Sequence, residues 1–175
     1  MVSYRRCRLA GGSYFFTVTL RDRQANTLVD KIDDLRSVVK RTRQERPFRI
    51  DAFVVLPEHL HAVWTLPPDD SDYAGRWRRI KSRFTHILVK NGMALSKDRR
   101  GEYNLWQRRY WEHNIRDEED FRHHLQYIHY NPVKHGWVER VRDWPYSTFH
   151  RFVRRGVYPV DWAGSESSLD GEYGE

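Results

Sequence analysis

The stretch Leu56–Trp64 constrains the fold of this chain more than any other part of the sequence. It reads Leu-Pro-Glu-His-Leu-His-Ala-Val-Trp and alternates with the period of two that is typical of a half-buried β-strand. Leu60 and Trp64 then lie on one face, and His59 and His61 lie on the other. Two residues of a strand rise by about 6.6 Å, so both imidazoles can reach one metal ion or one phosphate. A polar sheet face, with ring nitrogens bonded to nearby backbone, is the alternative.

A helix predicted to begin at Asp117 supplies possible partners for the histidine pair. Asp117 and the acids that follow it form a strong helix start. The helix places His123, Tyr127 and Asn131 along one edge, because each is four residues from the next. Pro132 disfavours helical geometry at the residue before it, which predicts that Asn131 lies at or near the helix end. If this helix covers the histidine face, Tyr127 and Asn131 approach the imidazoles.

The order of the predicted elements gives the fold class. Strands are expected at residues 14–20, 48–56, 59–66 and 106–115, and helices at residues 30–46, 77–91 and 117–131, with a last short helix near 149–153. The order strand, helix, strand, strand, helix, strand is that of a ferredoxin-like split βαβ fold with a central antiparallel sheet. The class is therefore α+β, with extra C-terminal helices that carry Tyr127.

The length favours a single domain with an acidic tail. A chain of 175 residues fits one domain with its own core, which we expect to span residues 1–162. Residues 163–175 are rich in Ser, Gly and acids, and we expect them to be disordered. Such a tail could fold over a basic groove and compete with a polyanion.

The charge balance predicts a polyanionic partner. Lys and Arg total 31 against 24 Asp and Glu, and the net charge is +7. The cations that could contact phosphates lie on or directly before the helix at 77–91 and in the loop after it: Arg76, Arg78, Arg79, Lys81, Arg83, Arg99 and Arg100. An ordinary solvated helix face is the alternative interpretation of this stripe.

The sequence also excludes several classes of protein and of binding site. It contains no run of about 20 apolar residues that could span a bilayer, and residues 1–12 lack the apolar region of a signal peptide. Its one cysteine, Cys7, excludes an internal disulfide and a cysteine-rich zinc site. We therefore expect a cytoplasmic protein with no membrane contact and no evident obligate protein partner, either a monomer or a dimer.

Two neutral histidines and an amide oxygen form a sparse ligand set with open positions. Such a set suits Mg²⁺ or Mn²⁺ that must also hold a phosphate oxygen. Zinc would prefer a third histidine, which His113, His123 or His124 could supply only if the geometry allowed it. The set formed by His59, His61 and Asn131 therefore predicts a divalent metal site.

Tyr127 is the candidate nucleophile beside this site. A phenol has a pKa of about 10, so a nearby metal or base must help it to ionise. Attack on a phosphodiester would give a phosphotyrosyl intermediate that a free hydroxyl can rejoin without ATP. Tyr130 competes for the same role, and His123 is a candidate relay because it shares the helix edge with Tyr127. A half-buried structural tyrosine is the alternative for Tyr127.

Four motifs carry a resemblance to a known family. They are Pro57-Glu58-His59-Leu60-His61, Trp111-Glu112-His113, Tyr127-Ile128-His129-Tyr130-Asn131-Pro132-Val133-Lys134-His135-Gly136 and Trp144-Pro145-Tyr146-Ser147. Together they resemble the REP-associated tyrosine transposases, which are single-tyrosine HUH nucleases related to insertion-sequence transposases. The resemblance implies that His59 and His61 bind the metal and that Tyr127 is the nucleophile. It places Asn131 as the third ligand, where relatives more often have Gln.

The resemblance also implies a reaction. It implies metal-dependent cleavage and strand transfer of single-stranded DNA at hairpin-forming repetitive extragenic palindromes, through a 5′-phosphotyrosine, in the bacterial cytoplasm near the nucleoid. Mg²⁺ or Mn²⁺ is the implied cofactor. A non-catalytic hairpin-binding or regulatory protein on the same fold is the alternative. An RNA-binding function would also suit a ferredoxin-like sheet, but no RNP-type aromatic signature is present.

Overall fold

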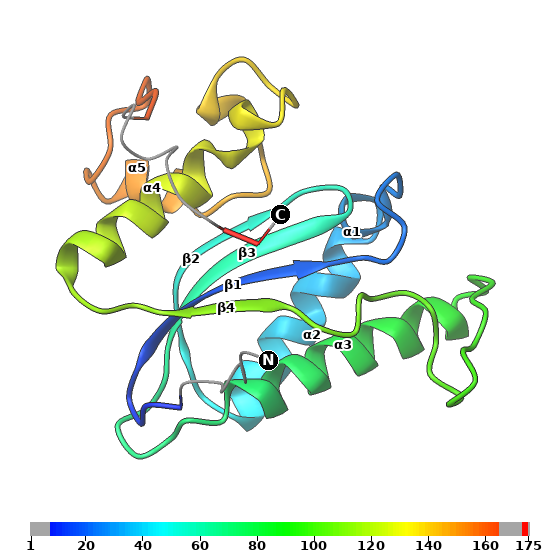
Figure 1. The fold of residues 1–175 in the computed structure, drawn as a ribbon. Coiled ribbons are helices and arrows are strands. Elements are labelled where there is room, and N and C mark those ends of the chain that lie inside the picture. The colour runs from blue at the N-terminus through cyan, green and yellow to red at the C-terminus, as the bar shows by residue number, and fades with distance from the viewer. Residues whose placement is uncertain (1–7, 165–172, 175) are drawn as a thin grey trace, which may run out of the picture.

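The computed structural model describes residues 8–164 and 173–174, and a four-stranded antiparallel sheet forms its centre (Figure 1). The strands are β1 (Ser13–Thr19), β2 (Arg49–Val55), β3 (His59–Thr65) and β4 (Trp111–Asn114), in the spatial order β2-β3-β1-β4. The two longest strand pairings place β3 between β2 and β1. The predicted α+β class with a central antiparallel sheet is confirmed.

Helices cover both faces of this sheet. Below it in Figure 1 lie α2 (Ile32–Glu45) and α3 (Tyr73–Lys90), and above it lie α4 (Glu118–Lys134) and α5 (Phe149–Arg154), while α1 (Thr27–Asp30) lies at the right-hand end of the strands. A short 3-10 helix, η1 (Val141–Asp143), connects the last two helices. No helix among the described residues is both long enough and apolar enough to cross a membrane.

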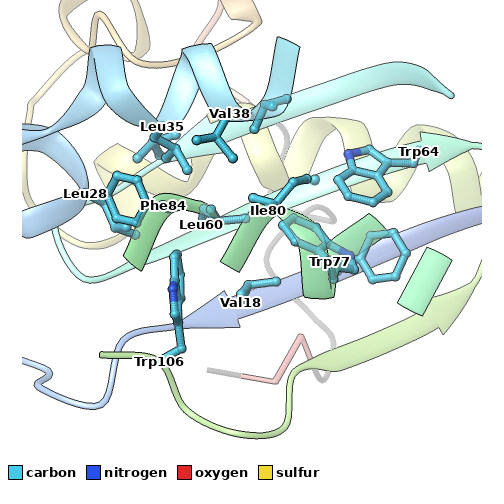
Figure 2. Packing of buried hydrophobic residues seen from close by; sticks show 14 of the residues in the cluster. Val18, Leu28, Leu35, Val38, Leu60, Trp64, Trp77, Ile80, Phe84 and Trp106 are labelled. Atoms are coloured by element: carbon cyan, nitrogen blue, oxygen red, sulfur yellow. The ribbon is translucent and has the colours of Figure 1, made fainter. Parts of the chain in front are cut away.

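The face covered by α2 and α3 is packed mainly with aromatic rings. The indoles of Trp64 on β3 and Trp77 on α3 stack with centroids 4.2 Å apart and planes 16° apart, and Phe16 of β1 packs 5.0 Å from Trp64. Figure 2 shows the Trp64 and Trp77 rings in the same layer as Leu60. Large rings bury much apolar area per residue, so this layer fixes which face of β3 points inward.

Arg76 is part of this layer and does not point into solvent. Its side chain is 1% exposed. Its guanidinium donates to Asp70 Oδ2 at 2.7 Å, to the Pro47 carbonyl at 2.7 Å and to the Asp72 carbonyl at 2.9 Å. A buried charge needs partners of this kind, and these partners hold the start of α3 against the end of α2. The predicted phosphate contact by Arg76 therefore does not fit its position.

The helix that carries Tyr127 begins as predicted and ends later. Asp117 caps α4 by accepting a hydrogen bond from the Asp120 amide at 2.8 Å. The helix continues through Pro132 to Lys134, whereas Pro132 predicted an end near Asn131. It stops at Gly136, where φ is +70° and the Gly136 amide bonds the Val133 carbonyl at 2.9 Å. Asn131 is therefore a helical residue.

Two other boundaries differ from the sequence prediction. The fourth strand covers only Trp111–Asn114, although Trp106 still forms an isolated bridge with Leu20 beyond the end of β1 while its ring packs on Phe84 of α3 at 5.7 Å between ring centroids. Asp30, predicted to cap the first long helix, instead ends the short helix α1. In both places tertiary packing overrides the local pattern.

Residues 144–148 protect the outer edge of β2. The Val55 amide donates to the Tyr146 carbonyl at 2.9 Å, and the Thr148 amide donates to the Phe53 carbonyl at 2.9 Å. This extra pairing covers an edge strand that would otherwise expose its backbone groups. His129 of α4 ties the same segment down, since its Nε2 lies 2.9 Å from Thr148 Oγ1.

We expect His129 to make the fold sensitive to acid. Burial, reinforced by the positive charges of Arg151 and His150, lowers the pKa of His129 from 6.5 to about 3. The unfolded chain binds this proton near pH 6.5 and the folded chain does not, so stability is intact above pH 6.5 and falls as the pH drops toward 3. Between pH 7.5 and 4.5 the loss should reach about 3 kcal/mol.

Urea unfolding at both pH values measures this effect. His129→Gln removes the titrating group and should lose less stability on acidification than the unmodified protein. The exposed His86→Gln is the matched control and should lose as much as the unmodified protein. Equal acid losses in all three proteins would contradict the assignment to His129.

Candidate active site

His59 and His61 lie on the face of β3 opposite to Trp64. Both are fully buried, and their ring centroids are 4.9 Å apart. Helix α4 covers them, and the Tyr127 ring lies 5.4 Å from the His61 ring with the planes at 72°. The structure therefore brings the predicted phenol to the predicted imidazole pair, although 66 positions separate Tyr127 from His61 in the chain.

Neighbouring side chains fix the orientation of both imidazoles. His59 Nδ1 lies 2.7 Å from Glu58 Oε1, and His61 Nδ1 lies 2.8 Å from Thr17 Oγ1. A histidine whose Nδ1 is held in this way presents Nε2 to a metal. His59 Nε2 is buried and has no hydrogen-bond partner among the described residues. A divalent cation would satisfy this atom, so the residues present fit the implied metal.

Glu58 remains ionised beside His59. Burial alone would raise the pKa of Glu58, but the hydrogen bond with His59 and the positive charge of Arg23 outweigh it, so the pKa lies below 4.5. An ionised carboxylate on Nδ1 increases the basicity of the imidazole and holds its tautomer. Glu58 belongs to the Pro-Glu-His-Leu-His motif, but sequence reasoning gave it no role.

Asn131 lies one turn beyond Tyr127 on α4 and is fully buried. This spacing puts both side chains on the same edge of the helix. An amide oxygen on this edge is a suitable oxygen ligand for Mg²⁺ or Mn²⁺. The placement agrees with the predicted role of Asn131, which stays a prediction.

Lys134 contacts the phenol of Tyr127 and was missed by the sequence reasoning. Its Nζ donates to the Tyr127 hydroxyl at 3.1 Å and lies 4.8 Å from the centre of the ring. An ammonium at this distance stabilises negative charge on the phenol oxygen. The spacing of seven residues, two helical turns, is the sequence signal that could have indicated this contact.

Tyr130 does not lie at the histidine pair, and the side chain of His123 is 35% exposed. The Tyr130 ring packs beside Gly164, where an added Cβ would approach the ring to 2.7 Å. The nearest acid to His123 is Glu119, at 3.9 Å on the same helix. His135, which had no predicted role, instead lies near the pair, with its ring centroid 5.2 Å from that of His59.

A second group of possible ligands lies beside the histidine pair. His113, Asp120 and His124 place one ligand atom each within 4.8 Å of one another, close enough to hold a metal ion. Asp120 Oδ2 already accepts from His113 at 2.8 Å and from the Arg116 amide at 3.0 Å. Burial opposes ionisation of Asp120, but these bonds lower its pKa to about 2. The group ties the start of α4 to β4.

The ring of Phe15 stands between the two groups. Its centroid lies 5.5 Å from that of His61 and 4.8 Å from that of His124. His113 and His124 therefore pair with Asp120 and do not complete a three-histidine site with His61. The candidate metal ligands next to Tyr127 remain His59, His61 and Asn131.

Tyr173 reaches this site from the C-terminal tail. Residues 165–172 and 175 of the predicted tail lie outside the described residues, but Tyr173 is described and only 7% exposed. Its ring stacks on Tyr127 with centroids 3.5 Å apart, and its carbonyl accepts from Thr17, the residue that also holds His61. Figure 1 shows the end of the chain beside β3. Tyr173 thus covers the candidate nucleophile.

The remaining predicted phosphate contacts fall into two groups. Arg78 and Lys81 line a groove of about 690 Å³ between α3 and residues 97–110, together with Trp106 and Tyr110. Arg99 and Arg100 lie exposed in that loop region.

Arg79 and Arg83 instead point toward α2. They pair with Glu45 at 3.5 and 2.6 Å. Their charge is therefore partly neutralised by a protein carboxylate.

Comparison with known proteins identifies the family. Over 164 residues the sequence is 51% identical to the REP-associated tyrosine transposase of Escherichia coli K12, covering 94% of this chain and 92% of that protein. This chain belongs to the REP-associated tyrosine transposase family. A relative in that family from Haemophilus influenzae is 48% identical over 167 residues, covering 94% of this chain and 95% of its own length. No protein-family model matches the sequence.

A solved structure supports the same conclusion. The structure of a REP-associated tyrosine transposase bound to a REP hairpin matches this fold with a TM-score of 0.88 at 50% identity, over 100% of this chain and 98% of that chain. The family resemblance inferred from the four motifs is confirmed, and the chain is a transposase, an enzyme.

Removing the Tyr173 ring should open the site. We expect Tyr173→Ala to bind a single-stranded DNA oligonucleotide about 3- to 10-fold more tightly, because DNA no longer has to displace an aromatic stack on Tyr127. Fluorescence anisotropy measures the change. Tyr173→Phe keeps the ring and the backbone contact with Thr17, so it should bind as the unmodified protein does. Equal affinity for all three proteins would show that the tail does not compete.

Proposed function

We propose that this transposase is a metal-dependent single-stranded DNA endonuclease and strand transferase that acts beside hairpin-forming repetitive palindromes. The observation that carries the proposal is the position of Tyr127, 5.4 Å from His61 and next to two imidazoles whose Nδ1 atoms are both anchored. The relative solved with a REP hairpin supports hairpin DNA as the substrate class.

The Tyr127 oxygen attacks the phosphorus of the scissile phosphodiester. A bond forms between that oxygen and phosphorus, the bond from phosphorus to the 3′ oxygen breaks, and the products are a 5′-phosphotyrosine and a free 3′-OH. The phenol proton is lost to solvent and the departing oxygen gains a proton. Because the number of phosphoester bonds is unchanged, a 3′-OH can reverse the step without ATP. Rejoining a different 3′-OH transfers the strand.

The residues around Tyr127 prepare the phenol. Lys134, 3.1 Å from the hydroxyl, stabilises the phenolate, which is the reactive form. His59, His61 and Asn131 would hold Mg²⁺ or Mn²⁺, and such an ion neutralises charge on a phosphate oxygen. Glu58 and Thr17 keep the imidazole nitrogens directed at that position.

The DNA would follow the cationic groove on α3. Arg78 and Lys81 supply charge along this groove, and the rings of Trp106 and Tyr110 provide stacking surfaces. Arg99 and Arg100 extend the positive surface. A transposase that works on chromosomal repeats would act in the bacterial cytoplasm, at the nucleoid.

A covalent adduct tests the nucleophile. We expect the unmodified protein to form an SDS-resistant adduct with single-stranded DNA that carries a hairpin, and Tyr127→Phe to lower its yield by at least about 10³-fold while binding is kept. Tyr130→Phe is the matched control and should form the adduct at an unchanged rate. An adduct in Tyr127→Phe would remove this residue from the mechanism. Binding with no adduct in the unmodified protein would support a regulatory hairpin-binding function.

Metal binding tests the ligand set separately from activity. We expect isothermal titration with Mn²⁺ to show a site that His59→Gln weakens by at least about 10-fold, and EDTA to abolish the adduct. His113→Gln alters the second group and should leave this Mn²⁺ site unchanged. The opposite result, with His113 required and His59 dispensable, would move the metal to the group around Asp120.

A further inference from the structure

A groove at the edge of the sheet is not used by the proposed reaction. It has a volume of about 470 Å³ and lies between α2 and residues 145–148. Its floor is apolar and includes Leu35, Val39 and Val55. These residues belong to the packed layer on the α2 face, whereas Tyr127 belongs to the layer on the α4 face. The groove is therefore distinct from the candidate active site.

The rim of this groove is strongly positive. Four cations line it, and no acidic side chain does: Arg36, Lys40, Arg43 and Arg151. Lys40 has no ion pair within the described ranges 8–164 and 173–174. Arg36 makes a long contact with Asp33 at 3.4 Å, and its guanidinium lies 5.9 Å from the centre of the Tyr146 ring. Most of the rim charge is thus available to an anion.

Arg151 shows that the cations are crowded. Its Nη2 donates to the carbonyls of Ile50 and Asp51 at 3.1 and 2.6 Å, but its buried Nε has no hydrogen-bond partner among the described residues. Burial lowers the pKa of Arg151, and the positive charges of Arg155 and Arg43 lower it further. Asp51 offsets only part of this effect. An anion bound in the groove would relieve the repulsion.

We propose that this groove binds an unpaired nucleotide from the single-stranded flank of the DNA substrate, with the base on the apolar floor beside Tyr146 and the neighbouring phosphates on the rim cations. The inference rests on the proposed function for its ligand class. A pocket of about 470 Å³ admits a base that has left the stack, whereas a duplex presents only its convex phosphate surface. Aromatic and apolar walls with flanking cations are the features by which single strands are bound.

The rigid wall of the groove favours a flexible, unpaired segment of the DNA. A hairpin substrate has a duplex stem and unpaired flanks, and only the flank and the loop offer free bases. Residues 145–148 form one wall, and residues 146–148 also pair with the edge of β2. This wall is therefore rigid, and a preformed wall lowers the entropy cost of ordering a flexible strand.

Two labelled oligonucleotides distinguish the flank from the stem. One is a hairpin with a single-stranded flank, and the other is the same hairpin with a blunt end. Fluorescence anisotropy in EDTA measures binding without cleavage. We expect the double variant Arg36→Glu/Lys40→Glu to bind the flanked hairpin about 10- to 100-fold more weakly and the blunt hairpin within about 3-fold of the unmodified protein. For the flanked hairpin, the slope of log affinity against log salt concentration should become shallower by about 1.4, which corresponds to the loss of two single-strand phosphate contacts.

Lys90→Glu is the charge control for this experiment. Lys90 is exposed at the end of α3 and does not line the groove. Its charge reversal should leave the preference for the flanked hairpin unchanged. An equal loss on both hairpins in the double variant would show a stem contact or a general charge effect, and no loss on either would show that the groove is not used. Either result overturns the proposal.

Tyr146→Leu tests the base contact itself. Leucine keeps apolar bulk at this position but removes the stacking ring, and we expect about 10-fold weaker binding of the flanked hairpin. With abasic sites throughout the flank, the unmodified protein and Tyr146→Leu should bind equally. A difference that persists on the abasic flank would contradict base binding. Because adduct formation depends on Tyr127, a failed nuclease assay and a failed groove assay remain separate results.

Discussion

The antiparallel pairing of β3 with β1 is the constraint on which the rest of the structure depends. Its register places Tyr14 opposite Trp64 and Thr17 opposite His61. A shift by one residue would exchange the faces of β3 and put the imidazoles in the aromatic layer. The Trp64–Trp77 stack makes that exchange costly, because the Trp64 ring would lose its stacking partner and enter the candidate active site. Packing of the aromatic face of β3 thus keeps His59 and His61 on the opposite face.

Helix α4 completes the site by contributing residues from successive turns. Its first turn is tied to β4 through Asp120 and His113, and its middle presents Tyr127 to His61. Its last turn brings Lys134 to the same phenol. A helix fixed at its start and packed along its length holds such side chains to a narrow range of positions. This precision is what in-line attack on a phosphodiester needs.

The cationic grooves and the covered tyrosine together indicate how the enzyme would bind DNA. Cationic grooves lie beside α3 and at the outer edge of β2, whereas Tyr173 covers Tyr127 between the two helical layers. DNA bound through the grooves would raise the local concentration of strand at the covered site. Displacement of a stacked ring is a small cost against several phosphate contacts.

The sequence by itself determined the two-faced strand, the α+β class and the motif residues, because alternation and helical spacing report which side chains share a face. His59, His61, Tyr127 and Asn131 were predicted as site residues in this way. Only the tertiary structure decided that Tyr127 rather than Tyr130 meets the histidines, and that Arg76 is buried among protein partners. Periodicity states which residues share a face, but packing decides what covers that face. The contact between Tyr173 and Tyr127 depends on such packing, so no local pattern contained it.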